Sequence, residues 1–196
     1  MFKINNLTYQ YDKTRKALDN VSMDFNKGNI IGIIGSNGSG KSTLFNNLMG
    51  ILKSTEGEIL YDGEQIKYDK KSLYNLRKEV GIVFQDPEKQ IFYSMVYDDI
   101  AFGLRSSKED EENIKIKIDS ILEEFQIERL RNKQIYKLSG GEKKVVAIAG
   151  IIVMSPEIIL MDEVTSSLDP KSRRTVINLI KDLKETIVIA SHDLDM

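Results

Sequence analysis

The nine residues Gly35-Ser36-Asn37-Gly38-Ser39-Gly40-Lys41-Ser42-Thr43 decide the fold of this chain. They fit the pattern G-x-x-x-x-G-K-[ST], whose glycines let backbone N–H groups turn inward around phosphate oxygens without a Cβ clash. The apolar run Ile30–Ile34 before them suits a buried strand, and Ser42–Met49 after them carries apolar residues at helical spacing. This order of strand, loop and helix is the context that a phosphate-binding loop needs, and a chance glycine-rich turn would not have both flanks.

The polar side chains of this loop each have an expected task at a bound nucleotide. Lys41 can reach the β- and γ-phosphates, the Ser42 hydroxyl can ligate Mg²⁺, and the hydroxyl or N–H of Thr43 can bind the α-phosphate. The helix that follows points its positive end at the same anion. The sequence therefore predicts nucleotide-binding residues at Gly35, Ser36, Asn37, Gly38, Ser39, Gly40, Lys41, Ser42 and Thr43.

Further apolar runs predict a mainly parallel sheet with helices between its strands. The expected strands of this sheet, besides Ile30–Ile34, are Val80–Phe84, Ile158–Met161 and Ile187–Ala190. Helical patterns cover Gly141–Val153 and Pro170–Lys184. Nearer the N-terminus, Phe2–Tyr9 and Val21–Phe25 read as strands, and the second alternates apolar and polar residues.

The composition changes between Asp86 and Lys137, where we expect a mostly helical insert. The charged run Lys108–Glu112 is expected to open a helix, because acidic residues are favourable at a helix start; a binding patch is the alternative. The apolar stripe of this helix is Ile114, Ile118, Ile121, Leu122 and Phe125. The expected organisation is one domain over residues 1–196, with a core of 1–86 and 138–196 and a helical subdomain at about 87–137.

Polar side chains follow three of the expected strands, at the sheet edge where open α/β folds bind ligands. Asp162 suits a Mg²⁺ shell, usually through water, and Glu163 suits a general base that orients the attacking water. His192, the only histidine of the chain, can lie near the γ-phosphate. The Gln85 amide could bind Mg²⁺ or water. Taken alone, the two acids could instead be exposed caps, and His192 and Gln85 ordinary surface residues.

The bulk properties exclude several classes of protein. With 196 residues, a net charge of −2 and a pI of about 5.6, the chain has no broad basic surface for nucleic acid. It has no cysteine, which removes disulfides and thiolate metal sites and fits a reducing compartment. No apolar run approaches the about 20 residues of a membrane span, and Met1–Asn6 lacks a signal-peptide core. We therefore expect a cytoplasmic protein whose membrane role comes through a partner.

Six stretches resemble, in this order, the motifs of ATP-binding-cassette (ABC) ATPases called Walker A, Q-loop, signature, Walker B, D-loop and switch histidine. They are Gly35–Thr43, Gln85, Leu138–Glu142, Ile158–Glu163, Ser167–Asp169 and His192. The resemblance covers nearly the whole chain. It implies a P-loop NTPase with a RecA-like α/β core, an N-terminal antiparallel β portion and a helical subdomain. It also implies Mg²⁺-dependent hydrolysis of ATP to ADP and phosphate.

The resemblance assigns further roles. ABC ATPases pair head to tail, so Ser139, Gly140 and Gly141 would bind a γ-phosphate held by a second ATPase subunit. Tyr11 looks like the aromatic residue that stacks on adenine, with Tyr9 as the second choice and simple strand packing as the alternative. Lys41 and His192 would stabilise the γ-phosphate. Ser42, Gln85 and Asp162 would hold or organise Mg²⁺.

Two stretches, Phe84–Phe92 and Asp98–Gly103, look like those of energy-coupling-factor and cobalt-type importer ATPases, and Leu138–Ala149 supports the same subgroup. Members of this subgroup power the uptake of vitamins and transition-metal ions. The resemblance therefore implies an integral membrane transporter subunit as partner, a peripheral position on the cytoplasmic face of the membrane, and no nucleic-acid partner. The substrate, and the choice between homodimer and heterodimer, stay open.

Three features depart from the family pattern. Val145 stands where arginine usually follows the signature, and Val164 where proline usually follows the Walker B glutamate. The chain also stops at Met196, shortly after His192, which we expect to reflect a C-terminal truncation or a short variant. Two alternatives stay open, and these departures favour the second of them. One is a soluble ABC ATPase acting on DNA or the ribosome, although a long coiled coil and a second cassette are missing. The other is a weakly hydrolysing regulatory module.

Overall fold

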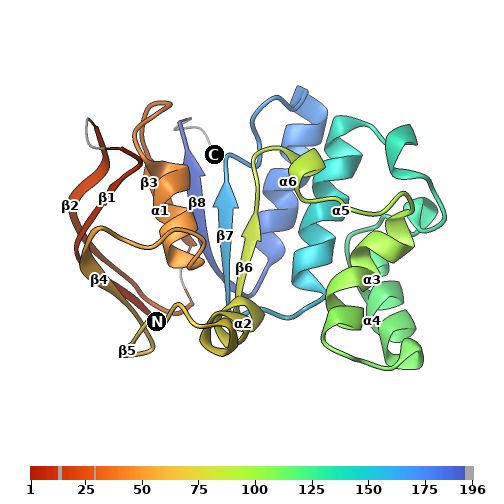
Figure 1. Cartoon of the computed structure of the whole chain (residues 1–196). Coiled ribbons are helices and arrows are strands. Elements are labelled where there is room, and N and C mark those ends of the chain that lie inside the picture. Colours follow the sequence, from red (N-terminus) through yellow and green to blue (C-terminus); the bar gives the residue numbers. More distant parts are fainter. Residues whose placement is uncertain (13–14, 29, 193–196) are drawn as a thin grey trace. The chain divides into compact units, whose positions relative to one another are not determined.

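The computed structural model describes residues 1–12, 15–28 and 30–192. Its strands are β1 (Phe2–Gln10), β2 (Lys16–Phe25), β3 (Ile30–Ile34), β4 (Glu56–Tyr61), β5 (Glu64–Gln65), β6 (Val80–Val83), β7 (Ile158–Asp162) and β8 (Thr186–Ser191). Its α-helices are α1 (Lys41–Leu48), α2 (Lys70–Glu79), α3 (Val96–Ser106), α4 (Glu111–Glu124), α5 (Gly140–Ile152) and α6 (Pro170–Asp182) (Figure 1). Short 3₁₀ helices are η1 (Pro87–Lys89), η2 (Glu128–Leu130) and η3 (Ile135–Lys137).

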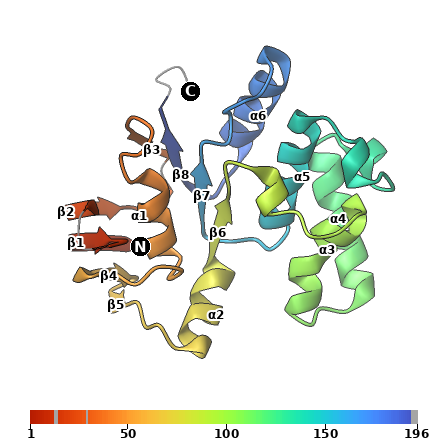
Figure 2. The same ribbon diagram turned by 45° about the horizontal axis from the view of Figure 1, so that its top comes forward.

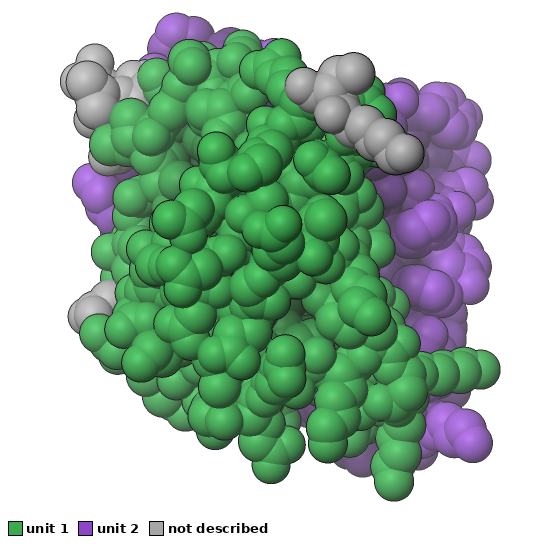
Figure 3. Space-filling view, turned by 60° about the vertical axis from the view of Figure 1, so that its left-hand side comes forward, with its two compact units in different colours: residues 1–82, 157–162, 184–196 green, residues 83–156, 163–183 purple. Residues whose placement is uncertain are grey.

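The chain divides into two compact units, which are coloured separately in Figure 3. Unit 1 consists of residues 1–82, 157–162 and 184–196, and unit 2 of residues 83–156 and 163–183. The boundary falls between Asp162 and Glu163, so the two adjacent strand-end acids belong to different units.

The N-terminal part of unit 1 is an antiparallel sheet with the strand order β2-β1-β4-β5. Its central strand β1 pairs Ile4 with Met23 on one side and with Ile59 on the other. Ile4 and Ile59 are buried, as alternating strand residues facing a core should be. The antiparallel β portion is thus confirmed. Strand β2 begins at Lys16, before the expected Val21, and β4 and β5 were not predicted.

The second sheet has the strand order β3-β8-β7-β6. Strand β8 runs parallel to both β3 and β7, as predicted. Every residue of β7 and β8 is buried, which is why these strands read as apolar runs rather than as alternating patterns. Helix α1 contacts β7 and, on its other side, β2, so in unit 1 it lies between the two sheets (Figure 1).

Unit 2 is mainly helical. Helix α3 contacts α4 and α5, and α5 contacts α6; Figure 2 shows α3, α4 and α5 side by side. Four residues of the expected apolar stripe, Ile114, Ile118, Ile121 and Leu122, are buried on α4, whereas the fifth, Phe125, is half-buried at the C-cap of this helix. The helical subdomain is present, but unit 2 also takes in α5 and α6. Its limits at about residues 87–137 therefore stay a prediction.

Two helix ends differ from the sequence-based expectation by two residues or more. The helix expected to open at Lys108 begins at Glu111, because the carboxylate of Asp110 accepts a hydrogen bond from the N–H of Asn113 at 3.0 Å and caps it there. Lys108 instead has a φ of 61° in the turn after α3. The expectation for Lys108–Asp110 was therefore wrong. Helix α6 ends at Asp182, two residues before the expected Lys184, because Leu183 has extended backbone angles.

The helices of this chain are short. The longest, α4, has 14 residues and mixes buried isoleucines with exposed charges. Within residues 1–12, 15–28 and 30–192, no helix has the length and apolar character needed to cross a membrane.

Candidate functional site

The phosphate loop connects β3 to α1 in unit 1, as the sequence predicted. Gly38 and Gly40 have φ values of 80° and 97°, which L-residues adopt only with strain. Gly40 is also the N-cap of α1, and a Cβ at this position would lie 2.4 Å from the carbonyl oxygen of Ala17. The exposed residues of the loop are Ser36, Asn37, Gly38 and Ser39.

Lys41 directs its ammonium back over the loop. Its Nζ donates to the carbonyl oxygen of Gly35 at 2.6 Å and to that of Ser36 at 3.1 Å, and the residue is buried. At the start of the loop, the N–H of Gly35 donates to the carbonyl of Ser191 at 3.2 Å. The loop is therefore fastened to the end of β8, and a positive charge is held beside its backbone N–H groups.

Tyr11 lies next to the first turn of α1. Its hydroxyl is 3.2 Å from the Thr43 hydroxyl, and its ring meets the edge of Tyr9 with 5.0 Å between centroids. Tyr11 is 64% exposed, whereas Tyr9 is half-buried. A flat exposed ring beside the phosphate loop is free to take a base on its face, which favours Tyr11 over Tyr9 for that task.

The remaining predicted residues of unit 1 lie at the carboxyl edge of the parallel sheet. Asp162 is the buried last residue of β7 and pairs with Ala190 of β8. His192 is exposed directly after β8, whose Ser191 pairs with Ile34 at the end of β3. Ser42 is exposed on the first turn of α1. The structure thus brings Asp162 and His192 to the edge where the phosphate loop begins.

Gln85 and Glu163 face each other within unit 2. The Gln85 Nε2 donates to Glu163 Oε2 and to the Ser166 hydroxyl, both at 3.3 Å. Glu163 is buried and has a φ of 45°, and its carbonyl accepts the N–H of Ser166 at 3.0 Å. A non-glycine residue in this backbone region is held there at a cost, which is typical of functional positions. Gln85 follows β6, which ends at Val83 rather than at the expected Phe84.

The signature stretch opens helix α5 in unit 2. The Ser139 hydroxyl accepts the N–H of Glu142 at 3.2 Å, and the Glu142 carboxylate accepts the N–H of Ser139 at 3.0 Å, which forms a capping box. The hydrogen bond from Ser139, followed by the Arg129 guanidinium, lowers the pKa of Glu142. Ser139 and Gly140 are exposed. Gly141 is buried, and a Cβ at this position would lie 2.4 Å from the Ser172 hydroxyl oxygen. The helix start is thus rigid and accessible.

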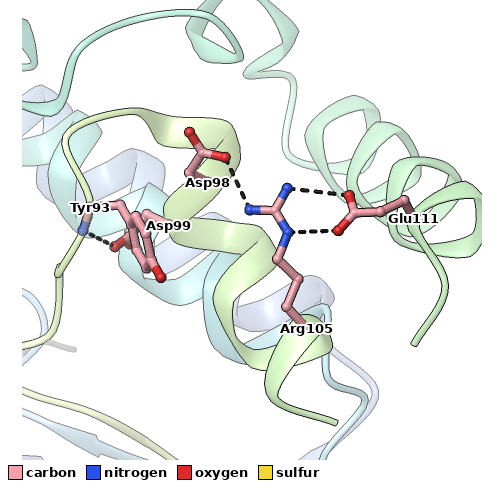
Figure 4. A network of polar contacts seen from close by, with 5 residues as sticks. All are labelled: Tyr93, Asp98, Asp99, Arg105 and Glu111. Atoms are coloured by element: carbon pink, nitrogen blue, oxygen red, sulfur yellow. Dashed lines mark hydrogen bonds and ion pairs between the residues drawn. The ribbon is translucent and has the colours of Figure 1, made fainter. Parts of the chain in front are cut away.

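The stretch that carries the importer resemblance forms an aromatic surface in unit 2. Phe92 and Tyr93 each pack against Phe102, with ring centroids 5.8 and 5.7 Å apart. Asp99 Oδ1 accepts the N–H groups of Phe92 and Tyr93 at 2.8 and 3.0 Å; the bond to Tyr93 is drawn in Figure 4. Burial raises the pKa of Asp99 although these bonds oppose the shift. Phe92 is 74% exposed.

Arg105 lies on α3, the helix that also carries Asp99 and Phe102, and it joins two acidic side chains, as Figure 4 shows. Its Nη1 lies 3.0 Å from Asp98, and its Nε lies 2.8 Å from Glu111. These ion pairs raise the pKa of Arg105, with the Glu111 hydrogen bond as the first cause. They link α3 to the start of α4, which helps to fix the aromatic surface.

The predicted metal ligands suit Mg²⁺ by their chemistry. Ser42, Asp162 and Gln85 offer hydroxyl, carboxylate and amide oxygens, the donors that this hard cation prefers. Among the residues that the structure describes, no three His, Asp or Glu side chains are grouped to hold a metal ion by themselves. The predicted set has one carboxylate, Asp162, which fits an ion that is bound by one or two carboxylates together with substrate phosphates.

Sequence reasoning missed residues that shape the site. Lys144 is buried and bonds the backbone of Phe84 and Gln85, and no periodic pattern distinguished it from a surface lysine. Gln90 joins Phe84 to Ala147. By contrast, the Ser139–Glu142 capping box could have been found, since S-x-x-E before an apolar run is its signature.

Fold and site together define a class of protein. A glycine-rich loop between a parallel strand and a helix, with a buried aspartate ending another strand of the same sheet, is the arrangement of a P-loop nucleoside triphosphatase. The phosphate loop, Asp162 and His192 belong to unit 1, and Gln85, Glu163 and the signature residues to unit 2.

Comparisons with known proteins agree with this class. The sequence model of the ABC transporter family matches residues 18–166. The energy-coupling factor transporter ATP-binding protein EcfA2 of Clostridium perfringens is 42% identical over 100% of this chain and 70% of its own length. The solved structure of cbiO1 from Clostridium perfringens, described as part of the ABC transporter complex cbiONQ, is 42% identical with a TM-score of 0.89, covering 99% of this chain and 79% of that one.

A second solved structure shares the fold at lower identity. The ATP-binding cassette MJ0796, solved as a dimer in a post-hydrolysis state bound to ADP and Pi, is 30% identical with a TM-score of 0.88, over 100% of this chain and 89% of that one. The present chain belongs to the ABC transporter family. It is an ATPase that binds ATP and hydrolyses it to drive transport, and this confirms the predicted fold and activity.

Proposed function

We propose that this chain is the ATPase subunit of an energy-coupling-factor-type importer, bound peripherally to the cytoplasmic face of the membrane, and that the substrate is a transition-metal ion or a vitamin. The support is the 42% identity to EcfA2 and to cbiO1. The second of these proteins, cbiO1, is described as part of the ABC transporter complex cbiONQ. The ATPase does not select the substrate, so an integral membrane subunit does.

The observation that carries the catalytic part is the 3.3 Å contact between Gln85 Nε2 and Glu163 Oε2. A buried carboxylate held by a neighbouring amide can orient a water and take its proton as the water oxygen attacks the γ-phosphorus. The bond from that phosphorus to the bridging oxygen then breaks, which releases ADP. Lys41 and His192 offset the charge of the transferred group.

The residues of unit 1 bind the nucleotide in this proposal. The backbone of Gly35–Thr43 receives the phosphates, and the Tyr11 ring stacks on adenine. Ser42 and Asp162 would hold Mg²⁺, which supplies charge neutralisation on the phosphates when bound, and Gln85, the further predicted ligand, belongs to unit 2. The buried Lys41 ammonium, already held beside the loop, needs little reorganisation to meet the γ-phosphate.

The second half of each ATP site comes from another ATPase subunit. Ser139 and Gly140 are exposed at the start of α5, and Gly141 follows them. N–H groups of a first helical turn, with the positive end of the helix, suit a γ-phosphate held by the partner chain. The dimer of MJ0796, described with ADP and Pi, supports such a pair.

The membrane partner would contact the aromatic surface of Phe92, Tyr93 and Phe102. Exposed aromatic rings that pack on one another are costly in water and are enriched at interfaces. Asp99 holds Phe92 and Tyr93 through their backbone N–H groups, so the surface is ordered before a partner arrives.

Retention by washed membranes tests this proposal. The chain is co-expressed with or without the integral subunit, as wild type, Phe92→Ser, or Ile116→Ser, a control in which an exposed apolar residue of α4 is replaced. Wild type and Ile116→Ser should be retained only with the integral subunit. Phe92→Ser should be retained at least about 30-fold less, since aromatic anchors carry about 2 kcal/mol or more, while its ATPase activity persists. Retention without the integral subunit, or equal retention of both variants, would contradict it.

A further inference from the structure

We propose that Lys144 is a positioning residue for ATP hydrolysis, because its buried ammonium fixes the backbone of Phe84 and Gln85 and so sets where the Gln85 amide meets Glu163. This inference rests on the proposed roles of Gln85 and Glu163. All four residues belong to unit 2.

The first step is the burial of the charge. Lys144 is 1% exposed on α5, and its Nζ donates to the carbonyl oxygens of Phe84 at 3.1 Å and Gln85 at 2.5 Å. A buried ammonium is expensive unless it is well hydrogen-bonded, and an apolar residue of similar length costs nothing of this kind. The following residues Val145, Val146 and Ala147 are apolar and buried. A lysine at 144 is therefore a poor choice for packing alone.

The second step is what the ammonium holds. Strand β6 ends at Val83, so Phe84 and Gln85 lie beyond the described strand. Beyond the end of the strand, side chains form the hydrogen bonds that hold this backbone. The Phe84 N–H donates to Gln90 Oε1 at 3.1 Å, and Gln90 Nε2 donates to the Ala147 carbonyl at 2.8 Å. Both the N–H and the carbonyl of Phe84 are thus fixed to α5, one through Gln90 and the other through Lys144.

The third step is the effect on Gln85. Its amide donates to Glu163 and to Ser166 at 3.3 Å, near the long end of hydrogen-bond geometry. A backbone shift of about 1 Å would remove both bonds, and misplacements of this size cost up to about 100-fold in rate. Glu163 cannot easily follow, because it is buried in a left-handed conformation. The position of the Gln85 backbone therefore decides whether the amide reaches the carboxylate.

Helix α5 has Ser139 as its N-cap and carries Lys144 beyond its first turn. The signature end of α5 and the backbone of Gln85 are consequently held by one rigid element. Lys144 acts through Gln85 and does not need to touch the nucleotide.

Lys144→Met tests the inference, since it removes the ammonium and keeps an apolar chain of similar length. We expect kcat to fall about tenfold, because two carbonyls lose a charged donor, and KM for ATP to change less than about twofold. The matched control is Lys143→Met, which breaks only the 2.5 Å ion pair with exposed Glu88. Lys143 is half-buried, but its partner is exposed, and ion pairs that reach solvent in this way contribute at most about 1 kcal/mol. This control should therefore hydrolyse ATP at close to the wild-type rate.

A double-mutant cycle with Gln85→Ala distinguishes positioning from a general structural role. If Lys144 acts through Gln85, adding Lys144→Met to Gln85→Ala lowers kcat no further. A further tenfold loss in that background would overturn the inference while leaving the proposed function intact. If Gln85→Ala alone hydrolyses ATP at the wild-type rate, the proposed role of Gln85 fails and the inference fails with it. Should Lys144→Met not fold, Lys144→Gln removes the charge and keeps a polar side chain, and the same cycle applies.

Discussion

Replacing Gly40 by alanine should destabilise the chain more than replacing Gly38, although both glycines lie in the phosphate loop. Their φ values are similar, at 97° and 80°. Their surroundings differ. A Cβ on Gly40 would lie 2.4 Å from the carbonyl oxygen of Ala17 in β2, and 3.1 Å from Leu18 Cδ2, whereas a Cβ on Gly38 would meet no heavy atom within 4 Å. Gly38→Ala is therefore a matched control for backbone strain.

The expected magnitudes follow from these contacts. An L-residue in the left-handed region costs about 1–2 kcal/mol, and the restriction of the unfolded chain by alanine returns about 0.4–1 kcal/mol. Gly38→Ala should therefore lose about 1 kcal/mol of unfolding free energy. Gly40→Ala should lose about 1–3 kcal/mol more, because the backbone of β2 or α1 must move to relieve the overlap. The unfolded-state contribution cancels between the two variants.

Urea unfolding without nucleotide is the assay, since bound ATP would add stability by mass action. The difference should also appear in thermal unfolding, where about 1 kcal/mol corresponds to about 2–4 °C for a domain of this size. Equal midpoints for the two variants, or a lower midpoint for Gly38→Ala, would refute the reasoning that Gly40 is required by close approach of β2.

Two further predictions concern the carboxylates of unit 2. Glu163→Gln should keep ATP binding but lose at least about 100-fold in turnover, because an amide cannot take the proton of the attacking water; unchanged hydrolysis would exclude Glu163 as the base. The Ser139 N–H and the Arg129 guanidinium lower the pKa of Glu142 from 4.5, so this carboxylate contributes stability above pH 4.5 that is lost as pH falls through the lowered value. Unfolding free energy should therefore fall more steeply with acid in the wild type than in Glu142→Gln, and parallel pH curves would contradict this.

The sequence predicted the parallel sheet and the phosphate loop because both follow from local patterns. Strands buried on two faces must be apolar throughout, as Ile158–Met161 is, and a phosphate cradle needs glycines and a lysine at fixed spacing. Asp162 and His192 could then be placed at one edge without knowing any contact, since parallel strands end on the same side. Asp162 ends β7 and His192 directly follows β8, which agrees with that reasoning.

Features that depend on distant partners could not be predicted in this way. Strand β4 carries Glu56 and Glu58 and has only a short apolar run, and it is held in the sheet by its pairing with β1. The start of α4 was misjudged because Asp110 serves as a cap rather than as a helical acid. Lys144 was missed because a lysine beside Lys143 reads as solvated surface until the carbonyls above it are known.

The capping box of α5 bears on how the proposed two-chain site accepts a phosphate. Ser139 and Glu142 satisfy each other's N–H groups, so the glycines between them are the first-turn donors that an incoming anion can use. The Glu142 carboxylate would repel that anion if its charge were uncompensated. Arg129 lies 2.5 Å from it and offsets the charge. Because the Arg129 side chain is exposed, solvent screens the pair, which therefore affects the local potential more than the stability. The capping box thus orders the start of α5, and the Arg129 charge keeps the Glu142 carboxylate from repelling a phosphate there.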